Sequence, residues 1–338
     1  MNLVRPTLAG LLAGALASGL AAPAAAAAPA PRAGDSTELL AKVTDDAPAG
    51  ATAAARAARY WEDRLGKRLP TEVAEVLGTD DSDGEADDPD DPTDPEVTKP
   101  PTGPDPDRAA PDPAAAAGAD ATVAAVGRLV GFNPKSKKHF HCTAAVVTSL
   151  SKSLLLTAGH CVHRGKGGAQ AQNLAFVPAY EGAANRPYGV WGVSRIRVMD
   201  GWKDRHLRGR DLAFAVVEPR GGRALASVVG ANGLVFRGKR RVAVVEIGYP
   251  ANGAYTGDVQ VRCADTTTRS ILWKQNKMGC DTKGGASGAP WLRGFDRKTG
   301  RGSVMALHSQ SPDKLDVCYG PILDGAALRA YDKIKNDA

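Results

Sequence analysis

A serine flanked by glycines is the first place in this chain where residue types and spacing could do chemistry. Ser287 lies between Gly285 and Gly288 in the segment from Lys283 to Trp291. Glycine adopts backbone conformations that other residues avoid, so successive N–H groups can point to one spot beside the serine oxygen. Such an arrangement suits the nucleophile of an acyl transfer. Taken alone, the same segment is also typical of a plain turn between two strands.

A serine nucleophile needs a base, and the base needs an orienting carboxylate. His160 follows an apolar run, 154–156, and a tight small-residue turn, and it precedes Cys161. Asp211 comes directly before the apolar run 212–217, where a carboxylate is costly unless a donor such as a histidine N–H compensates its charge. A lone histidine is more often structural, and Asp211 could equally be a hydrogen-bond acceptor at the start of a strand. We interpret four other histidines as structural or exposed: His139, His141, His163 and His206.

The elements that must position these residues are short strands. Apolar runs rich in Val, Ile and aromatic residues recur from Val123 onward and are separated by Gly, Pro and charged turns, which predicts an all-β barrel or sandwich. From Ala121 onward, only Gly325 to Lys335 has helical spacing. The part of the chain from Ala121 is long enough for two small barrels that share an interface. The predicted strands are Val123–Phe132, Cys142–Val147, Ser153–Thr157, Leu174–Pro178, Trp191–Val198, Asp211–Val217, Val242–Tyr249, Val259–Cys263, Trp291–Leu292 and Val304–His308.

The N-terminus has the pattern of an export signal. Arg5 provides a positive start, an apolar run extends from about Leu8 to Ala22, and small residues follow at Ala24 to Ala26. This pattern predicts a signal peptide over residues 1–28 and a secreted, extracellular product. The apolar run is too short and too rich in Ala and Gly for a membrane span, so we expect no membrane association.

Residues 29–120 form a predicted pro-segment of two kinds of sequence. Helical spacing between Ala51 and Leu77 predicts one or two short helices, whereas Asp80 to Pro113 is rich in Asp and Pro and predicts a disordered linker. The segment from Thr79 to Asp120 contains fourteen acidic residues and only two basic ones. The whole chain nevertheless has a net charge of +6, so the part from Ala121 is strongly basic. Retention of the linker in the secreted product is the alternative.

Basic surface of this kind favours anionic surroundings such as cell-wall polymers or acidic proteins. We expect no nucleic-acid partner, because no basic cluster is interleaved with aromatic residues.

All five cysteines lie in the basic part of the chain, at Cys142, Cys161, Cys263, Cys280 and Cys318. Export makes disulfides plausible, but counting cysteines leaves their pairing open. Metal-type cysteine spacing is absent, so we expect neither a metal nor an organic cofactor.

Three separated motifs give a closer resemblance. They are the stretch Thr157 to Cys161, the stretch Asp211 to Ala213 and the stretch Gly285 to Pro290. In this order they resemble the His, Asp and Ser motifs of the chymotrypsin-like serine endopeptidases. Residues 176–178 and 248–250, together with Cys280, make the sequence similar to the secreted bacterial branch that includes glutamyl endopeptidases. The resemblance covers roughly Val123 to Tyr331, which places the protease domain at 121–338.

The resemblance implies a fold and a set of roles. The fold would be two six-stranded antiparallel β-barrels followed by a C-terminal helix. His160, Asp211 and Ser287 would be the catalytic residues, and the N–H groups of Gly285 and Ser287 would form the oxyanion hole. Cys142 would pair with Cys161, Cys263 would pair with Cys280, and Cys318 would remain free.

Specificity is expected from the strand that ends near His308. In glutamyl endopeptidases a histidine at this place helps to receive the substrate carboxylate, and His308 followed by Ser309 is similar. The resemblance therefore implies a preference for Glu or another acidic residue before the scissile bond, called P1; a polar strand end without a selective role is the alternative. Two residues depart from the family pattern. Ala286 stands where animal enzymes have an aspartate, and Ala289 replaces a glycine and would crowd the turn if that backbone required positive φ.

The prediction is thus a secreted, monomeric serine endopeptidase that acts on proteins or peptides and is made as a precursor. Two other functions use the same residues. A protease-like module without activity would bind a partner instead, and the complete set of His160, Asp211, Ser287 and Gly285 argues against it. An esterase would use the same three catalytic residues on a different substrate.

Overall fold

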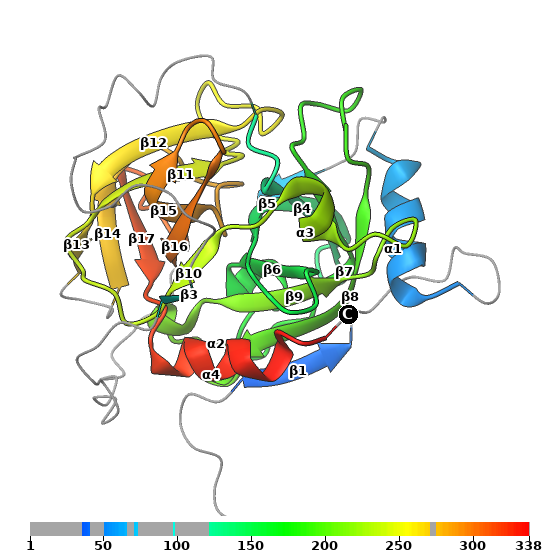
Figure 1. Ribbon diagram of the computed structural model, residues 1–338, viewed down its shortest axis with the longest axis horizontal. Coiled ribbons are helices and arrows are strands. Elements are labelled where there is room, and N and C mark those ends of the chain that lie inside the picture. The colour runs from blue at the N-terminus through cyan, green and yellow to red at the C-terminus, as the bar shows by residue number, and fades with distance from the viewer. Residues whose placement is uncertain are drawn as a thin grey trace, which may run out of the picture. The chain divides into compact units, whose positions relative to one another are not determined.

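The computed structural model describes residues 36–40, 51–65, 71–73, 97–98, 122–270 and 275–337 (Figure 1). All of them belong to one compact unit that begins at Ala33. The predicted signal peptide lies outside the described residues, and so does the acidic linker apart from Val97 and Thr98. Strands dominate the described chain, as the sequence predicts. None of its described helices is long and apolar enough to cross a membrane.

Six antiparallel strands close into a first barrel. Each strand pairs with two others in the order β8, β7, β4, β5, β6, β9, and a further β8–β9 pairing closes the ring. All ten strands predicted from the apolar runs are present across the chain, with ends shifted by a few residues. Those of the first barrel are β4 (Val126–Asn133), β5 (Lys138–Val146), β6 (Leu154–Thr157), β7 (Gln172–Pro178), β8 (Trp191–Met199) and β9 (Ala213–Val217).

Burial explains why β9 is apolar at every position. All five of its residues are buried, because one face lines the barrel and the C-terminal helix α4 (Gly325–Ile334) contacts β8 and β9 from outside. The ring of Tyr331 in α4 lies 5.9 Å from the ring of Phe214 in β9. Asp324 caps α4 by accepting hydrogen bonds from the N–H groups of Ala326 and Ala327. The helix predicted at the C-terminus is therefore confirmed, and it ties the end of the chain to the first barrel.

The second half contains two sheets instead of one closed six-stranded ring. One has the order β12, β11, β15, β16, β10, β3, and the other has the order β13, β14, β17. Isolated bridges join residue 306 to 322 and residue 310 to 319, so the two sheets remain in contact. The strands are β3 (Val97–Thr98), β10 (Gly233–Val235), β11 (Ala243–Gly248), β12 (Val261–Thr266), β13 (Thr268–Arg269), β14 (Gln275–Gly279), β15 (Pro290–Asp296), β16 (Arg301–Leu307) and β17 (Val317–Pro321).

Short elements complete these two halves. Two short helices that the sequence did not indicate, α2 (Asp200–Arg205) and α3 (Leu225–Val229), precede and follow β9.

Two strands from the predicted pro-segment extend the first barrel at its outside: β1 (Ser36–Leu40) pairs with β8, and β2 (Thr71–Val73) pairs in parallel with β5. The sequence predicted one or two short helices between Ala51 and Leu77, and the strand at Thr71–Val73 was not predicted. Strand pairing with β5 overrides the local helical spacing there.

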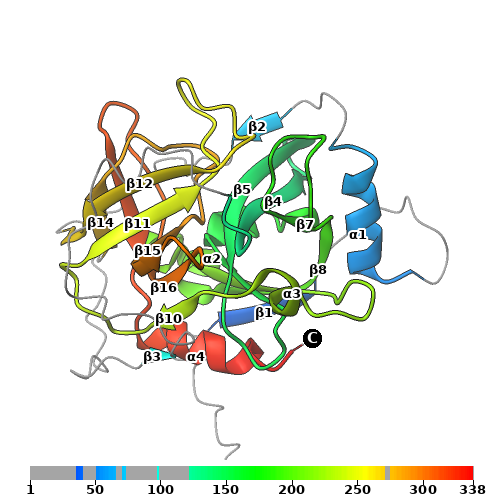
Figure 2. The ribbon, with the colours of Figure 1, turned by 45° about the horizontal axis from the view of Figure 1, so that its top comes forward.

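The predicted helix before the linker is present as α1 (Ala53–Glu62), and it lies against the first barrel. Figures 1 and 2 both show it on the side of the barrel away from the second half. Trp61 is buried and its indole N–H donates to the Asn173 carbonyl at 2.5 Å. Gly192 in β8 lies under the helix, where a Cβ atom would stand 1.8 Å from the Ala54 carbonyl oxygen. The helix therefore does not occupy the region between the two halves.

Candidate active site

Pairing of β6 with β9 brings two of the predicted catalytic residues together. Thr157 at the end of β6 pairs with Ala213 at the start of β9. A short 3-10 turn from Gly159 to Cys161 follows β6, and Asp211 lies two residues before β9. The register alone therefore places His160 beside Asp211, although 51 residues separate them in the sequence.

His160 and Asp211 share two hydrogen bonds. The His160 backbone N–H donates to one carboxylate oxygen at 2.7 Å, and Nδ1 donates to the other at 2.7 Å. Ser309 donates its hydroxyl to the same carboxylate at 2.6 Å. Asp211 is fully buried, and these three donors compensate the cost of burying its charge. With Nδ1 bonded to the carboxylate, Nε2 is the nitrogen that can accept a proton. It is buried and has no hydrogen-bond partner among the described residues.

Trp202 from α2 covers this pair. Its ring centroid lies 6.2 Å from that of His160, and its indole N–H donates to the His163 carbonyl at 2.7 Å. A Cβ atom on Gly159 would lie 2.8 Å from the Trp202 ring and 3.0 Å from the Asp211 carboxylate. Glycine is therefore needed at this position for the three side chains to meet.

Backbone hydrogen bonds hold the Ser287 loop against β5. The Thr143 N–H donates to the Ser287 carbonyl at 2.8 Å, and the Gly288 N–H donates to the His308 carbonyl at 2.7 Å. Gly288 has a φ of +86°, and a Cβ atom there would be 3.0 Å from the Ala158 nitrogen. The loop thus lies directly against the turn that carries His160, and the structure brings all three predicted catalytic residues into one region.

Gly285 has the backbone conformation that a loop of converging N–H groups requires. Its φ is +91°, and its carbonyl accepts a hydrogen bond from the Thr143 hydroxyl at 3.0 Å. A Cβ atom at this position would stand 2.4 Å from the Tyr249 carbonyl oxygen and 2.6 Å from Nε2 of His141. The Gly284 carbonyl accepts a hydrogen bond from the Ala251 N–H at 2.6 Å. The Gly285 N–H lies on the opposite side of this same peptide, where it can act on a developing oxyanion.

Two disulfides stabilise the surroundings. Cys142 pairs with Cys161 beside His160, and Cys263 pairs with Cys280 ahead of the Ser287 loop. Cys318 is a free, buried thiol. Both pairings and the free cysteine agree with what the resemblance implied.

Solved structures of other proteins share this arrangement of strands. The chain is similar to a thermostable serine protease, AL20, from an extremophilic microorganism, with 30% sequence identity and a TM-score of 0.60. The match covers 64% of this chain and 100% of that protein. This chain belongs to the chymotrypsin-like serine proteases.

Other solved structures agree with this membership. The protease is 29% identical to Anisep from Arthrobacter nicotinovorans, with a TM-score of 0.60 over 64% of this chain and 97% of that one. It also resembles a Glu endopeptidase at 17% identity and a TM-score of 0.50, over 64% of this chain and 92% of that one, which shows the shared fold. No protein-family model and no curated protein matches the sequence. The protease is accordingly a hydrolase that acts on peptide bonds.

Neither departure from the family pattern disturbs the loop of the protease. Ala286 is fully buried, and its N–H donates to the Lys283 carbonyl at 2.9 Å, so the turn closes without a carboxylate. Ala289 does not have a positive φ. Its methyl group lies opposite Gly248, where a second Cβ atom would come within 2.8 Å of it. The crowding that the sequence suggested for Ala289 therefore does not arise.

The two residues expected to contact substrate have different surroundings. Ser309 is bound to Asp211, so its hydroxyl supports the pair formed by His160 and Asp211. His308 is buried and contacts Glu246 through Nδ1 at 3.1 Å and the Ser311 hydroxyl through Nε2 at 3.0 Å. Burial opposes the charged imidazole, but the thiol of Cys318 and the carboxylate of Glu246 outweigh it and raise the pKa of His308 well above 6.5.

Several functional residues of the protease carry no signal in the sequence. Thr143 supports Gly285, Trp202 covers His160, and Glu246 contacts His308, yet each belongs to an ordinary strand or helix. A buried glutamate inside an apolar strand is the one hint that sequence reasoning could have used, because such a residue is costly without partners.

Two clusters in the described part of the protease have metal-ligand atoms within 4.8 Å of one another. They are Cys142, His160 and Cys161, and Glu246, Cys280 and Cys318. Three of the four cysteines are in disulfides, so their sulfur atoms are not thiolate ligands. Neither cluster has the donor set of a zinc site.

Proposed function

We propose that the chain is a secreted serine endopeptidase that acts through an acyl-enzyme, with Ser287 as nucleophile. His160 accepts the serine proton at Nε2 as Ser287 attacks the scissile carbonyl, and the N–H groups of Gly285 and Ser287 stabilise the oxyanion. His160 then gives the proton to the leaving amine. Water reverses these steps and releases the acid. The observation that carries this proposal is the pair of hydrogen bonds from His160 to Asp211, which fixes the ring and leaves Nε2 for the serine proton.

We also propose how the precursor is exported and processed. Residues 1–28 would direct export, and residues 29–120 would act as a pro-segment before the protease domain, 121–338. The product would be an extracellular monomer. Mass spectrometry of the secreted protein gives its N-terminus, and a mature chain that still begins before residue 29 would contradict the signal peptide.

We also propose that the enzyme prefers Glu or another acidic residue at P1. His308 supports this proposal, because its strand is bonded to the Ser287 loop and the pKa of its ring is raised. A peptide library with Glu, Asp, Arg or Phe before the scissile bond tests it. Cleavage after Arg or Phe without cleavage after Glu would contradict the acidic preference and leave the protease mechanism intact.

Labelling with a fluorophosphonate tests the nucleophile itself. The secreted protein should form one covalent adduct at Ser287, and Ser287→Ala should form none. An unlabelled wild-type protein would overturn the proposed mechanism. Ester hydrolysis with no cleavage of any peptide in the library would replace the endopeptidase function by an esterase function.

A further inference from the structure

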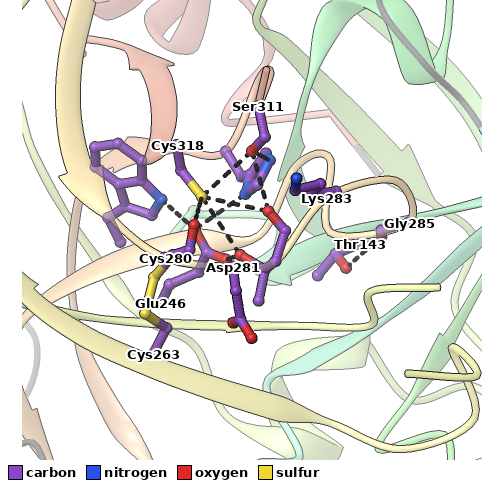
Figure 3. A network of polar contacts seen from close by, with 12 residues as sticks. Thr143, Glu246, Cys263, Cys280, Asp281, Lys283, Gly285, Ser311 and Cys318 are labelled. Atoms are coloured by element: carbon purple, nitrogen blue, oxygen red, sulfur yellow. Dashed lines mark hydrogen bonds and ion pairs between the residues drawn. A yellow bond between two sulfur atoms is a disulfide. The ribbon is translucent and has the colours of Figure 1, made fainter. Parts of the chain in front are cut away.

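Glu246 is a carboxylate buried in the second half of the molecule. It lies in β11 and is fully buried. One of its oxygens accepts the Thr282 hydroxyl at 2.6 Å, and the other accepts the Trp291 indole N–H at 2.7 Å and Nδ1 of His308 at 3.1 Å. Figure 3 shows Glu246 at the centre of this network, next to Cys318. Every donor around this carboxylate except Nδ1 of His308 is neutral, so a positive charge on His308 is what balances it.

Hydrogen-bond directions around His308 lead to the same charge. Nδ1 faces a carboxylate, which only accepts, so Nδ1 carries a proton. Nε2 faces the Ser311 hydroxyl at 3.0 Å, and that hydroxyl lies 3.0 Å from the Thr282 carbonyl. The carbonyl is a stronger acceptor than the sulfur of Cys318, 3.4 Å away, so the hydroxyl proton goes to Thr282. Ser311 then accepts from Nε2, and both ring nitrogens of His308 carry protons.

The titratable groups that act on this ring come from two strands. Glu246 belongs to β11, and Cys318 belongs to β17. Against the effect of burial, Cys318 and then Glu246 raise the pKa of the His308 ring. The carboxylate of Glu246 also lies 3.1 Å from Nδ1, so it fixes the orientation of the ring as well as favouring its charge.

His308 is also tied to the catalytic loop. Its N–H donates to the Ala289 carbonyl at 2.9 Å, and its carbonyl accepts from the Gly288 N–H at 2.7 Å, so the backbone on both sides is fixed next to Ser287. The ring itself is buried, but Ser311 beyond Nε2 is only partly buried. A substrate side chain that reaches Ser311 would meet the Nε2 side of the imidazolium.

We infer that Glu246 is a specificity-positioning residue, which holds His308 as an imidazolium with its Nε2–H group toward Ser311 so that the enzyme accepts a carboxylate side chain at P1. This inference rests on the acidic preference proposed above. Because Glu246 already balances the charge of His308, selectivity for Glu over its neutral isostere Gln comes from a charge-assisted hydrogen bond. Such a bond predicts a ratio of about 10 to 100 in kcat/KM.

The experiment measures the ratio of kcat/KM for two peptides that differ only in Glu or Gln at P1, between pH 6 and 9, on the secreted enzyme. An effect of pH on the chemical step itself changes both rates equally, so it cancels in the ratio. The wild-type ratio should be above about 10 at neutral pH. In Glu246→Gln it should fall about tenfold and decrease further as pH rises through the ordinary histidine pKa of about 6.5. Glu246→Asp should restore part of it.

A matched control removes a carboxylate elsewhere. Glu218 lies after β9 in the first barrel, and Glu218→Gln should keep the wild-type ratio and its pH profile. A wild-type preference for Glu that persists unchanged in Glu246→Gln would overturn the inference while the acidic specificity stands. A wild-type enzyme that cleaves both peptides equally would overturn the acidic specificity itself.

A second measurement observes the charge of His308 in the wild-type enzyme and needs no Glu246 variant. Nitrogen-15 NMR of histidine-labelled wild-type enzyme should show both ring nitrogens of His308 protonated at pH 8. The His308→Asn spectrum assigns the signal. A wild-type ring with one protonated nitrogen at this pH would overturn the inference.

Discussion

Asp211 accepts two hydrogen bonds from His160, one from the backbone N–H and one from the ring, each at 2.7 Å. The backbone bond fixes the position of His160, and the ring bond leaves Nε2 as the nitrogen that can accept a proton. Ser309 adds a third donor at 2.6 Å. The carboxylate therefore sets position and tautomer together.

Asp211→Asn should lower kcat about 10⁴-fold, because an amide at this place favours the wrong tautomer of His160. Steady-state hydrolysis of the best library peptide measures the effect. Ser309→Ala removes one donor but keeps the carboxylate, so it serves as the milder comparison. A loss of less than about tenfold in Asp211→Asn would show that the carboxylate does not orient the base.

Gly285→Ala should reduce kcat about 10² to 10³-fold, the usual cost of one oxyanion-hole donor. The new methyl group would collide with the Tyr249 carbonyl and with His141, and it would also disfavour a φ of +91°. Gly253→Ala is the matched control, since Gly253 also has positive φ but a methyl group there would have no neighbour within 4 Å. That control should keep its activity; equal losses in both variants would point to backbone strain in general.

Stability should fall with acid through His141. Burial, and then the charge of Arg128, lower the pKa of His141 to about 3, against a bond to the Tyr249 carbonyl. In the unfolded chain the pKa is about 6.5, so the unfolded state binds one more proton between pH 6.5 and 3. His141 therefore destabilises the folded state as pH falls through this window, by up to about 1.4 kcal/mol per pH unit.

Urea unfolding of the Ser287→Ala protein at several pH values measures this slope without self-digestion. His141→Asn should reduce the slope between pH 6 and 4 by about 1 kcal/mol per unit. An unchanged slope would mean that His141 is protonated in the folded protein.

Gly192→Ala should detach α1 from the first barrel. The added methyl group would overlap the backbone of Ala54, 1.8 Å from its carbonyl oxygen and 2.8 Å from its Cα atom. Hydrogen exchange of residues 51–65 should become faster than in the wild-type protein. Gly182→Ala, whose methyl group would have no neighbour within 4 Å, is the control and should leave this exchange unchanged.

Sequence patterns predicted ten of the strands, the C-terminal helix and the motifs that contain His160, Asp211 and Ser287, because these depend on local apolar spacing and on short segments. The pairing of β6 with β9 joins segments that are far apart in the sequence, so it depends on the fold and not on local spacing. Strands such as β14 and β17 lack an apolar run, and in β14 the buried side chains include the polar residues Gln275 and Asn276. Local spacing could not reveal them.

Other parts of the site depend on contacts between distant residues. Ser309 faces Asp211, 98 residues away, so its hydroxyl could not be assigned from its place beside His308. The sequence suggested that Ala289 would crowd its turn because it replaces a glycine. The space for its methyl group comes from Gly248 in another strand. The role of Glu246 depends on its hydrogen bonds with His308, Thr282 and Trp291, which are distant from it in the sequence.

The packing of α1 against the first barrel determines what would happen if the chain were cleaved between α1 and β4. Trp61 is bonded to Asn173, and Tyr60 is bonded to His139 at 2.7 Å, so the helix is held by residues that lie far along the sequence, 112 and 79 positions away. A cut between Leu65 and Thr122 would leave these contacts in place. We expect the two fragments of such a cut chain to stay associated through these contacts.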